Sequence, residues 1–203
     1  MIAALGKYRD PQVLAEANRL FAAWRTNPDA IPGSLKSTWL AVIARNADAA
    51  TWQAIHERAR VATSATERSS LYRLLGGAQD EALARRALDL SLTAEPGKTV
   101  SAGIITSVAQ QHPRLAIDFV LAHLAQVNEL IDISGRSRFM QGLAGASRDA
   151  ALIPVLDAYA QSNLAETDRK PIQQAIDRIR YESTQASRIR TETAAWLAAH
   201  PAG

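Results

Sequence analysis

The sequence predicts an all-α fold, a HEAT- or armadillo-like α-solenoid of about ten helices arranged as antiparallel pairs. Three observations predict it. Apolar residues recur at helical spacing between short turns, and no segment alternates as a strand would. Aromatic residues make up only 5% of the chain and alanine is frequent, which favours helices over sheets. Similar helical segments return after about 35–45 residues, the period of such repeats. We therefore expect a concave binding wall and no deep catalytic pocket.

In the N-terminal half, turn and cap residues mark where each helix begins and ends. Asp10 and Pro11 supply an N-cap and a proline at the first helical position, and Pro28 follows the end of this helix. The capping box Ser64-Ala-Thr-Glu67 opens a later helix, and Gly76-Gly77 ends it. Further helices are expected over residues 34–45, 50–61, 80–92 and 99–111.

In the C-terminal half, the strongest apolar stripe covers Leu115 to Leu130 and predicts one long helix. The segment Ile131-Asp-Ile-Ser-Gly135 breaks the pattern. Helices are expected next over residues 136–146 and 150–161. The last helical segment covers residues 168–200, and we expect a kink or break at its polar middle, Ser183-Thr-Gln185.

Length, charge and cysteine content exclude several classes of protein. The 203 residues suit a single helical-repeat domain over 1–203. Because there is no cysteine, disulfides and thiolate chemistry are excluded. No stretch reaches the roughly 18 apolar residues of a membrane span. The N-terminus lacks the pattern of a signal peptide and reads like the interior of a longer helical protein. The compartment stays open, with bacterial cytoplasm or periplasm both compatible.

Motifs of catalysis and metal binding are absent from the sequence, so we predict no catalytic and no metal-ligating residue. His56-Glu57 begins like a zincin motif, but the position of the second histidine holds Arg60, a permanent cation. His56 is therefore interpreted as part of a solvated helix face, and His123 as a core or rim histidine. No glycine-rich phosphate loop and no serine-nucleophile motif occurs.

Two arginines at the start of a predicted helix form a candidate anion site. Arg136 and Arg138 follow Ser134-Gly135 directly. The free N–H groups and the dipole at a helix N-terminus favour an anion. Arginine side chains at that position could grip a carboxylate, although arginines on an exposed capped helix are the alternative interpretation.

Five stretches of the sequence, taken in order, resemble one family. They are Gly6-Lys-Tyr-Arg-Asp-Pro-Gln-Val-Leu-Ala-Glu-Ala-Asn-Arg-Leu-Phe21, Thr51-Trp52 through the Ser64-Ala-Thr-Glu67 cap, Glu81-Ala-Leu-Ala-Arg-Arg-Ala-Leu-Asp-Leu90, Leu115-Ala-Ile-Asp-Phe-Val120, and Ala175-Ile-Asp-Arg-Ile-Arg180 leading to Ala195-Trp-Leu197. Together they resemble the C-terminal helical domain of gluzincin-type zinc aminopeptidases. Puromycin-sensitive, endoplasmic-reticulum and insulin-regulated aminopeptidases and their bacterial relatives belong to this group.

The resemblance implies a non-catalytic domain of a larger enzyme. The family's His-Glu-x-x-His and Gly-x-Met-Glu-Asn motifs lie in an upstream domain and are missing here. The resemblance thus implies zinc in the parent enzyme only and no cofactor in this chain. The implied partners are the catalytic domain of the same polypeptide and peptide substrates. This chain would wall the substrate cavity and tune peptide selection.

The resemblance also implies candidate cavity residues. The family's Phe-acidic-Leu-Gly-Ser stretch, which lies near the cavity, corresponds to Ile131-Asp-Ile-Ser-Gly135, with serine and glycine in reversed order. Its position agrees with the arginine anion site. The substrate-cavity candidates are Asp132, Ser134, Gly135, Arg136 and Arg138.

Two other functions are open to a helical-repeat chain. A free-standing helical-repeat module that binds a protein partner is the alternative. A nucleic-acid binder would need lysines and arginines clustered along one ridge, but basic and acidic residues alternate in the last segment and the net charge is only +3. We therefore expect no nucleic-acid partner. The face that would pack on a catalytic domain is expected to be apolar, so the isolated chain could dimerise.

Overall fold

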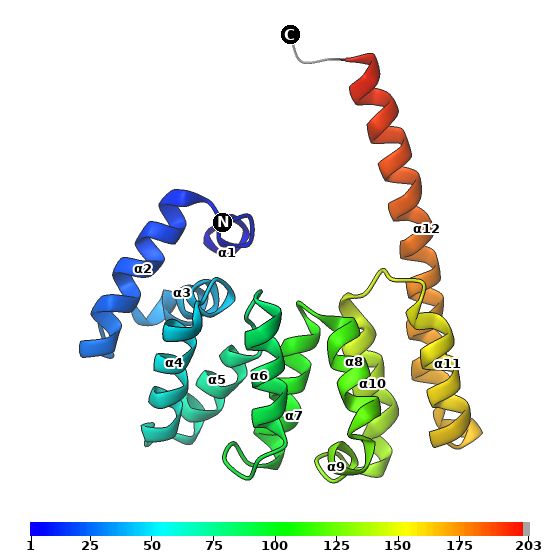
Figure 1. The fold of residues 1–203 in the computed structure, drawn as a ribbon, viewed down its shortest axis with the longest axis horizontal. Helices are drawn as coiled ribbons and strands as arrows, with labels where there is room; N and C mark the ends of the chain where they lie inside the picture. Colours follow the sequence, from blue (N-terminus) through cyan, green and yellow to red (C-terminus); the bar gives the residue numbers. More distant parts are fainter. Residues whose placement is uncertain (201–203) are drawn as a thin grey trace. The chain divides into compact units, whose positions relative to one another are not determined.

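The computed structural model describes residues 1–200, and all of their regular secondary structure is helical (Figure 1). These residues form twelve α-helices and three short 3-10 helices, with no strand among them. The prediction of an all-α, α-solenoid-like fold is confirmed. The chain divides into two compact units, Met1–Ile131 and Asp132–Gly203. The prediction of a single domain over residues 1–203 stays a prediction, and Pro201, Ala202 and Gly203 lie outside the described residues.

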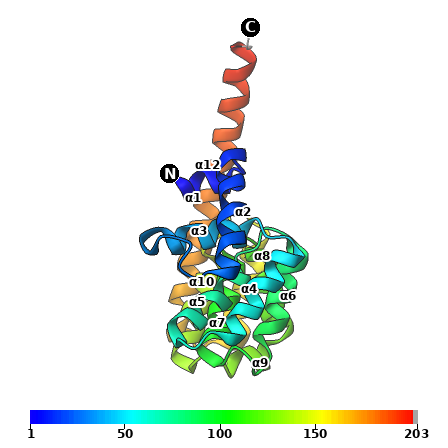
Figure 2. The same ribbon diagram turned by 90° about the vertical axis from the view of Figure 1, so that its left-hand side faces the viewer.

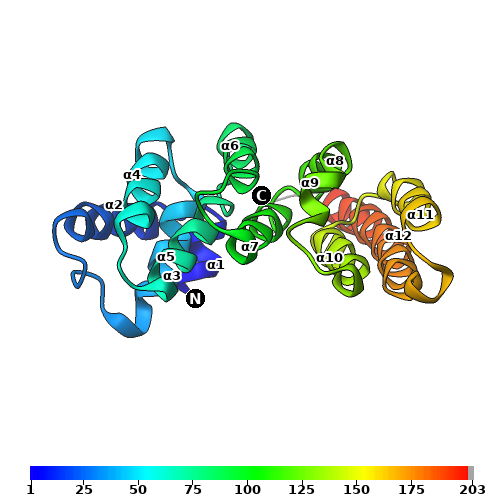
Figure 3. The same ribbon diagram turned by 90° about the horizontal axis from the view of Figure 1, so that it is seen from below.

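Unit 1 is a two-layered stack of helices. Its helices are α1 (Ile2–Lys7), α2 (Pro11–Thr26), α3 (Gly33–Arg45), α4 (Ala49–Val61), α5 (Ala65–Leu75), α6 (Glu81–Ser91), α7 (Lys98–Ala109), α8 (Pro113–Ala122) and α9 (Leu124–Asn128). α4 packs on α5 and α6 on α7, and contacts of α5 with α7 and of α7 with α8 join successive pairs. Seen from below, α4, α6 and α8 form one layer, with α5 and α7 in the other (Figure 3). This nearest-neighbour packing is typical of a helical solenoid.

The core of unit 1 lies between these two layers. Trp52, Tyr72 and Ile104 are among its largest fully buried side chains. The indole N–H of Trp52 donates to the carbonyl oxygen of Leu75 at 3.1 Å, which satisfies the one polar atom that this ring buries. Two helices approach each other closely at Gly76, where a Cβ atom would lie 2.6 Å from the carbonyl oxygen of Ile104. The layer spacing therefore depends on a glycine at this position.

Side-chain caps start four helices of unit 1 where the sequence predicted them or within a residue. Asp10 accepts from the backbone N–H of Gln12 and Val13, and Asp48 accepts from Thr51. Asp80 caps α6 and Ser64 caps α5 in the same way. Each cap satisfies N–H groups that have no partner inside the helix. In the capping box that begins at Ser64, Oε1 of Glu67 lies 4.0 Å from a guanidinium nitrogen of Arg58.

Unit 2 packs two helices against its long last helix. It contains the 3-10 helix η1 (Ile133–Gly135), α10 (Arg136–Leu143), η2 (Ala144–Ala146), α11 (Leu152–Asn163), η3 (Glu166–Asp168) and α12 (Lys170–Ala199). α12 buries Ile172, Ala175, Ile176 and Ile179 against α10 and α11. The guanidinium of Arg178 donates to the carbonyl oxygens of Ala144 and Gly145 and so caps the end of the α10–η2 segment.

Helix α12 is continuous, so the predicted kink at Ser183-Thr-Gln185 is wrong. The hydroxyl groups of Ser183 and Thr184 donate to the carbonyl oxygen of Arg180 in the same helix. Their polarity is satisfied locally, without leaving the helix. The second half of α12 extends past α10 and α11 (Figures 1 and 2) and leaves Ile189, Trp196 and Leu197 more than half exposed.

Two other expectations about helix boundaries are corrected. The single helix expected over Leu115–Leu130 is two helices, because His123 leaves the helical region with φ −117° and ψ 31°. Its ring packs beside that of Phe119, and the residue is half-buried. An unexpected short helix, α1, precedes Asp10. It packs so closely on α3 that a Cβ atom at Gly6 would lie 2.7 Å from Val42. None of the helices in residues 1–200 is both long and apolar enough to span a membrane.

Candidate functional site

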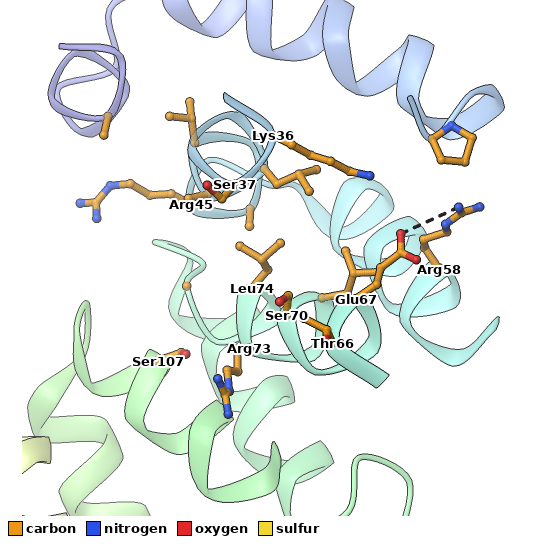
Figure 4. A pocket seen from close by; sticks show the side chains of 18 of the residues that line it. Lys36, Ser37, Arg45, Arg58, Thr66, Glu67, Ser70, Arg73, Leu74 and Ser107 are labelled. Carbon is orange, nitrogen blue, oxygen red and sulfur yellow. Dashed lines mark ion pairs between the residues drawn. The ribbon is translucent and has the colours of Figure 1, made fainter. Parts of the chain in front are cut away.

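A large open pocket lies within unit 1, between α3 and α5, with α1 and α7 at its margins (Figure 4). Its volume is about 1030 Å³, well above what a single side chain fills and in the range of sites that hold ligands. Leu40 and Leu71 are buried beneath it, and Leu74 points into its centre. The pocket therefore has an apolar floor that a ligand's side chain could cover.

Hydroxyl and amide groups surround this apolar floor. The polar uncharged residues that line the pocket are Ser37, Ser64, Thr66, Ser70, Ser107, Gln110 and Gln111. They come from α3, the cap and first turns of α5, the end of α7 and the turn after it. Such groups can donate to and accept from a peptide backbone. The combination of apolar floor and polar rim is typical of binding sites.

The pocket is also basic. Five of its lining residues are cations, namely Lys7, Lys36, Arg45, Arg58 and Arg73, against two carboxylates, Asp29 and Glu67. Of the five, Arg58 faces Glu67, and within residues 1–200 the other four form no ion pair with a carboxylate. No carboxylate of residues 1–200 pairs with these four side chains, so their positive charge acts on any ligand in the pocket.

Two of these arginines are held by neutral neighbours. A guanidinium N–H of Arg45 donates to the side-chain oxygen of Gln111. Arg73 lies across Gly103 of α7, where a Cβ atom would come 2.6 Å from its Nε atom. Because an amide and a glycine carry no charge, they position the guanidinium groups without neutralising them.

Two donors at this pocket are unsatisfied. The Nε–H groups of Arg45 and Arg58 are buried, and neither finds an acceptor among residues 1–200. A buried donor without a partner is costly, and native structures rarely leave one so. Both nitrogens are covered by protein atoms, so a ligand in the pocket would reach them only after these side chains move.

Sequence reasoning missed this pocket because its residues are far apart in the chain. Its cations come from α1, α3, α4 and α5, each as an isolated basic residue on a helix surface. Each of them alone looks like a solvated side chain, and only the packing of the four helices brings them together. The one available signal was the capping box at Ser64, whose serine and glutamate both line the pocket.

The five residues singled out from the sequence lie at the start of unit 2. Asp132 precedes η1, and Ser134 and Gly135 are in it. Arg136 and Arg138 are in the first turn of α10, as predicted. The two arginines differ in exposure: Arg136 is half-buried while Arg138 is exposed, as expected for positions two residues apart on a helix.

None of these five residues lines the unit 1 pocket. The positive charge of Arg136 acts on Tyr159, whose pKa is raised by burial and lowered in part by that charge. This effect places Arg136 toward the interior of unit 2. A contact of these residues with substrate stays a prediction.

His56 belongs to a polar cluster, so its interpretation as part of a solvated face is corrected. Its Nε2 atom lies 2.6 Å from Oε1 of Glu95 in the α6–α7 loop, and the hydroxyl of Tyr72 donates to the same oxygen at 2.8 Å. Arg68 donates to the backbone carbonyl of Glu95, and Arg60 lies 3.9 Å from its Oε2. The cluster fastens the α6–α7 loop to α4 and α5.

The cluster shifts the acidity of two of its members. Burial raises the pKa of Glu95, but the hydrogen bonds from His56 and Tyr72 and the nearby charges outweigh burial and hold the pKa below its usual value. Burial, together with the Glu95 carboxylate, raises the pKa of Tyr72 to about 12. At neutral pH the carboxylate is therefore charged and the phenol is a hydrogen-bond donor.

Residues 1–200 contain no group of three or more His, Asp or Glu side chains that could hold a metal ion. His56 and Glu95 are paired, and Arg60 lies near the same carboxylate. The family resemblance implies zinc in the parent enzyme only, and this stays a prediction.

Comparison with known protein families assigns most of the chain to a family. The family model described as ERAP1-like C-terminal domain matches residues 1–181, which cover both units up to the middle of α12. No individual characterised protein matches the sequence.

Proposed function

Because the chain belongs to the ERAP1-like C-terminal domain family, we propose that it walls the substrate cavity of a zinc-dependent aminopeptidase and tunes peptide selection. The upstream part of the polypeptide would remove N-terminal residues from peptides, with zinc bound there. This chain would contribute no nucleophile and no metal ligand. Its role is to bind the part of a peptide that lies away from the scissile bond.

The open pocket of unit 1 is the observation that supports this proposal most. It is large enough for several peptide side chains, with an apolar floor at Leu71 and Leu74 and a rim of hydroxyl groups. Helices and the turns that join them supply the walls, so the pocket is formed by the fold itself. Binding energy gained there, remote from the reacting bond, can favour long peptides over short ones.

The test fills the pocket and measures peptide selection. Ser70 lines the pocket and is exposed on α5, so Ser70→Trp adds bulk there without entering the core. Ala82→Trp makes the same addition on an exposed position of α6 outside the pocket and is the matched control. Both variants are made in the complete aminopeptidase polypeptide, and hydrolysis of peptides of increasing length is compared with that of an aminoacyl chromogenic substrate.

We expect Ser70→Trp to change the length preference while the chromogenic substrate, too short to reach the pocket, is cleaved at the wild-type rate. Ala82→Trp should change neither. An unchanged length profile in Ser70→Trp would refute the role in peptide selection. If no aminopeptidase polypeptide contains this chain, the alternative function, a free-standing module that binds a protein partner, replaces the proposal.

A further inference from the structure

We infer that the basic pocket of unit 1 selects peptides with acidic side chains, an inference that rests on the proposed function and names its substrate class. The first support is the charge of the lining. Lys7, Lys36, Arg45 and Arg73 have no carboxylate partner within residues 1–200, whereas Asp29 is the one lining carboxylate outside the Arg58–Glu67 pair. A negatively charged ligand would compensate these four cations, and a positively charged ligand would be repelled.

The second support is the hydrogen-bonding capacity of the guanidinium groups of Arg45 and Arg73, which pair with no carboxylate in the part of the chain that the structure describes. A carboxylate offers two oxygens that accept several hydrogen bonds, including the paired bonds that a guanidinium donates. A neutral amide side chain can fill the same space but accepts through one oxygen only. The pocket therefore distinguishes glutamate from glutamine.

The third support is the arrangement of the cations around the floor. Figure 4 shows Lys36, Arg45 and Arg73 on different sides of Leu74. An extended peptide whose apolar side chain covers Leu74 would thus have a cation near the residues before and after it. We expect the preferred sequences to carry an apolar residue flanked by Asp or Glu.

The experiment measures binding of labelled peptides to the full 203-residue chain by fluorescence anisotropy. The peptides have an apolar centre flanked by Glu, by Gln or by Lys, and all are amidated at the C-terminus. Side chains are then the only source of negative charge, and a terminal carboxylate cannot mimic them. Titrations at low and at high salt separate the electrostatic part of the affinity.

We expect the Glu peptide to bind about tenfold or more tightly than the Gln peptide, and the Lys peptide most weakly, because two or more charged contacts are gained. Lys36→Gln and Arg73→Gln should each reduce the Glu preference about three- to tenfold. Both side chains project from helix surfaces, so these variants should fold, and circular dichroism checks this. Arg85→Gln, which removes an exposed arginine outside the pocket, is the control and should bind as the wild type.

Equal affinity for the Glu and Gln peptides, or no binding of either, would overturn the charge preference. The two proposals fail separately. If Ser70→Trp alters length preference but Glu and Gln peptides bind equally, the cavity role holds and the acidic preference is wrong. If the Glu peptide binds selectively and length preference does not change, the pocket binds acidic peptides but does not set peptide selection.

Discussion

At the scale of single residues, a few positions carry strict geometric demands. Glycine is required where two helices approach most closely, at Gly6 against α3 and at Gly76 against α7. Arg9, in the turn between α1 and α2, is the one residue other than glycine with a positive φ in the described chain, at 59°. Substitutions at these positions give the clearest predictions about stability.

Replacing Gly76 by alanine is expected to destabilise unit 1 by about 2–3 kcal/mol. The added Cβ would lie 2.6 Å from the carbonyl oxygen of Ile104 and 2.9 Å from the Cβ of Ser107, so α5 and α7 would have to move apart. Urea unfolding followed by circular dichroism measures the change. Gly33→Ala, whose Cβ would meet nothing within 4 Å, is the control. Equal stability of the two variants would contradict the close packing.

Replacing Arg9 by glycine is expected to stabilise the chain by about 0.5–1 kcal/mol. Glycine adopts positive φ without steric cost, and the bonds that close this turn involve only the backbone. Asp10 N–H donates to the carbonyl of Leu5, and Arg9 N–H donates to that of Gly6, the arrangement of a Schellman motif. Urea unfolding of Arg9→Gly and of Arg9→Ala separates the relief of backbone strain from the loss of the arginine side chain. Alanine removes the side chain without relieving the strain, so it should give no gain in stability.

At the scale of helices, polar contacts fix how neighbouring elements meet. The Glu95 cluster joins the α6–α7 loop to α4 and α5, and Arg178 joins α12 to the end of the α10–η2 segment. The Glu95 cluster adds a dependence on pH.

Glu95→Gln is expected to lower the stability of unit 1 at neutral pH and to matter less as the solution becomes acidic. The folded-state pKa of Glu95 lies below its usual value of 4.5. The charged carboxylate therefore stabilises the fold above pH 4.5, and this contribution is lost as the pH falls through the lower folded value. Unfolding of wild type and variant from pH 3 to pH 8 measures the difference.

The control for this measurement is Glu81→Gln, which removes only an exposed ion pair with Arg85 and should change stability little. A wild-type advantage over Glu95→Gln that stayed constant down to pH 3 would show that the carboxylate charge is not what holds the loop.

At the scale of the whole molecule, the proposed function assigns peptide binding to this chain and chemistry to an upstream part of the polypeptide. The pocket of unit 1 is basic and open, and the sequence contains no His-Glu-x-x-His motif. This separation of binding from chemistry is directly measurable on the chain as it stands.

The purified 203-residue chain is expected to hydrolyse neither alanine nor arginine aminoacyl chromogenic substrates and to retain no stoichiometric zinc. Activity assays with and without added zinc, together with metal analysis, test this. The longest open reading frame that contains the chain serves as the comparison, and activity with bound zinc is expected only there. Zinc-dependent activity in the 203-residue chain would contradict the proposed division of roles.

The sequence by itself determined most of the helices, because the signals for a helix are local. Caps such as Asp10, Ser64 and Asp80 and the spacing of apolar residues lie within one element. The ordered set of family-like stretches likewise pointed to the family that residues 1–181 match. The exceptions, the break at His123 and the unbroken α12, depend on single backbone angles or hydroxyl bonds that apolar spacing does not encode.

Only the tertiary structure decided where the candidate site lies. Lys36, Arg45 and Arg73 are isolated surface cations in the sequence, and they share a pocket only because α5 packs against both α3 and α7. His56 likewise meets Glu95, a residue 39 positions away, through the loop that follows α6. Contacts between distant residues arise from packing of whole helix faces, which local spacing cannot specify. The anion site at Arg136 and Arg138 was inferred from local sequence, and anion binding there stays a prediction.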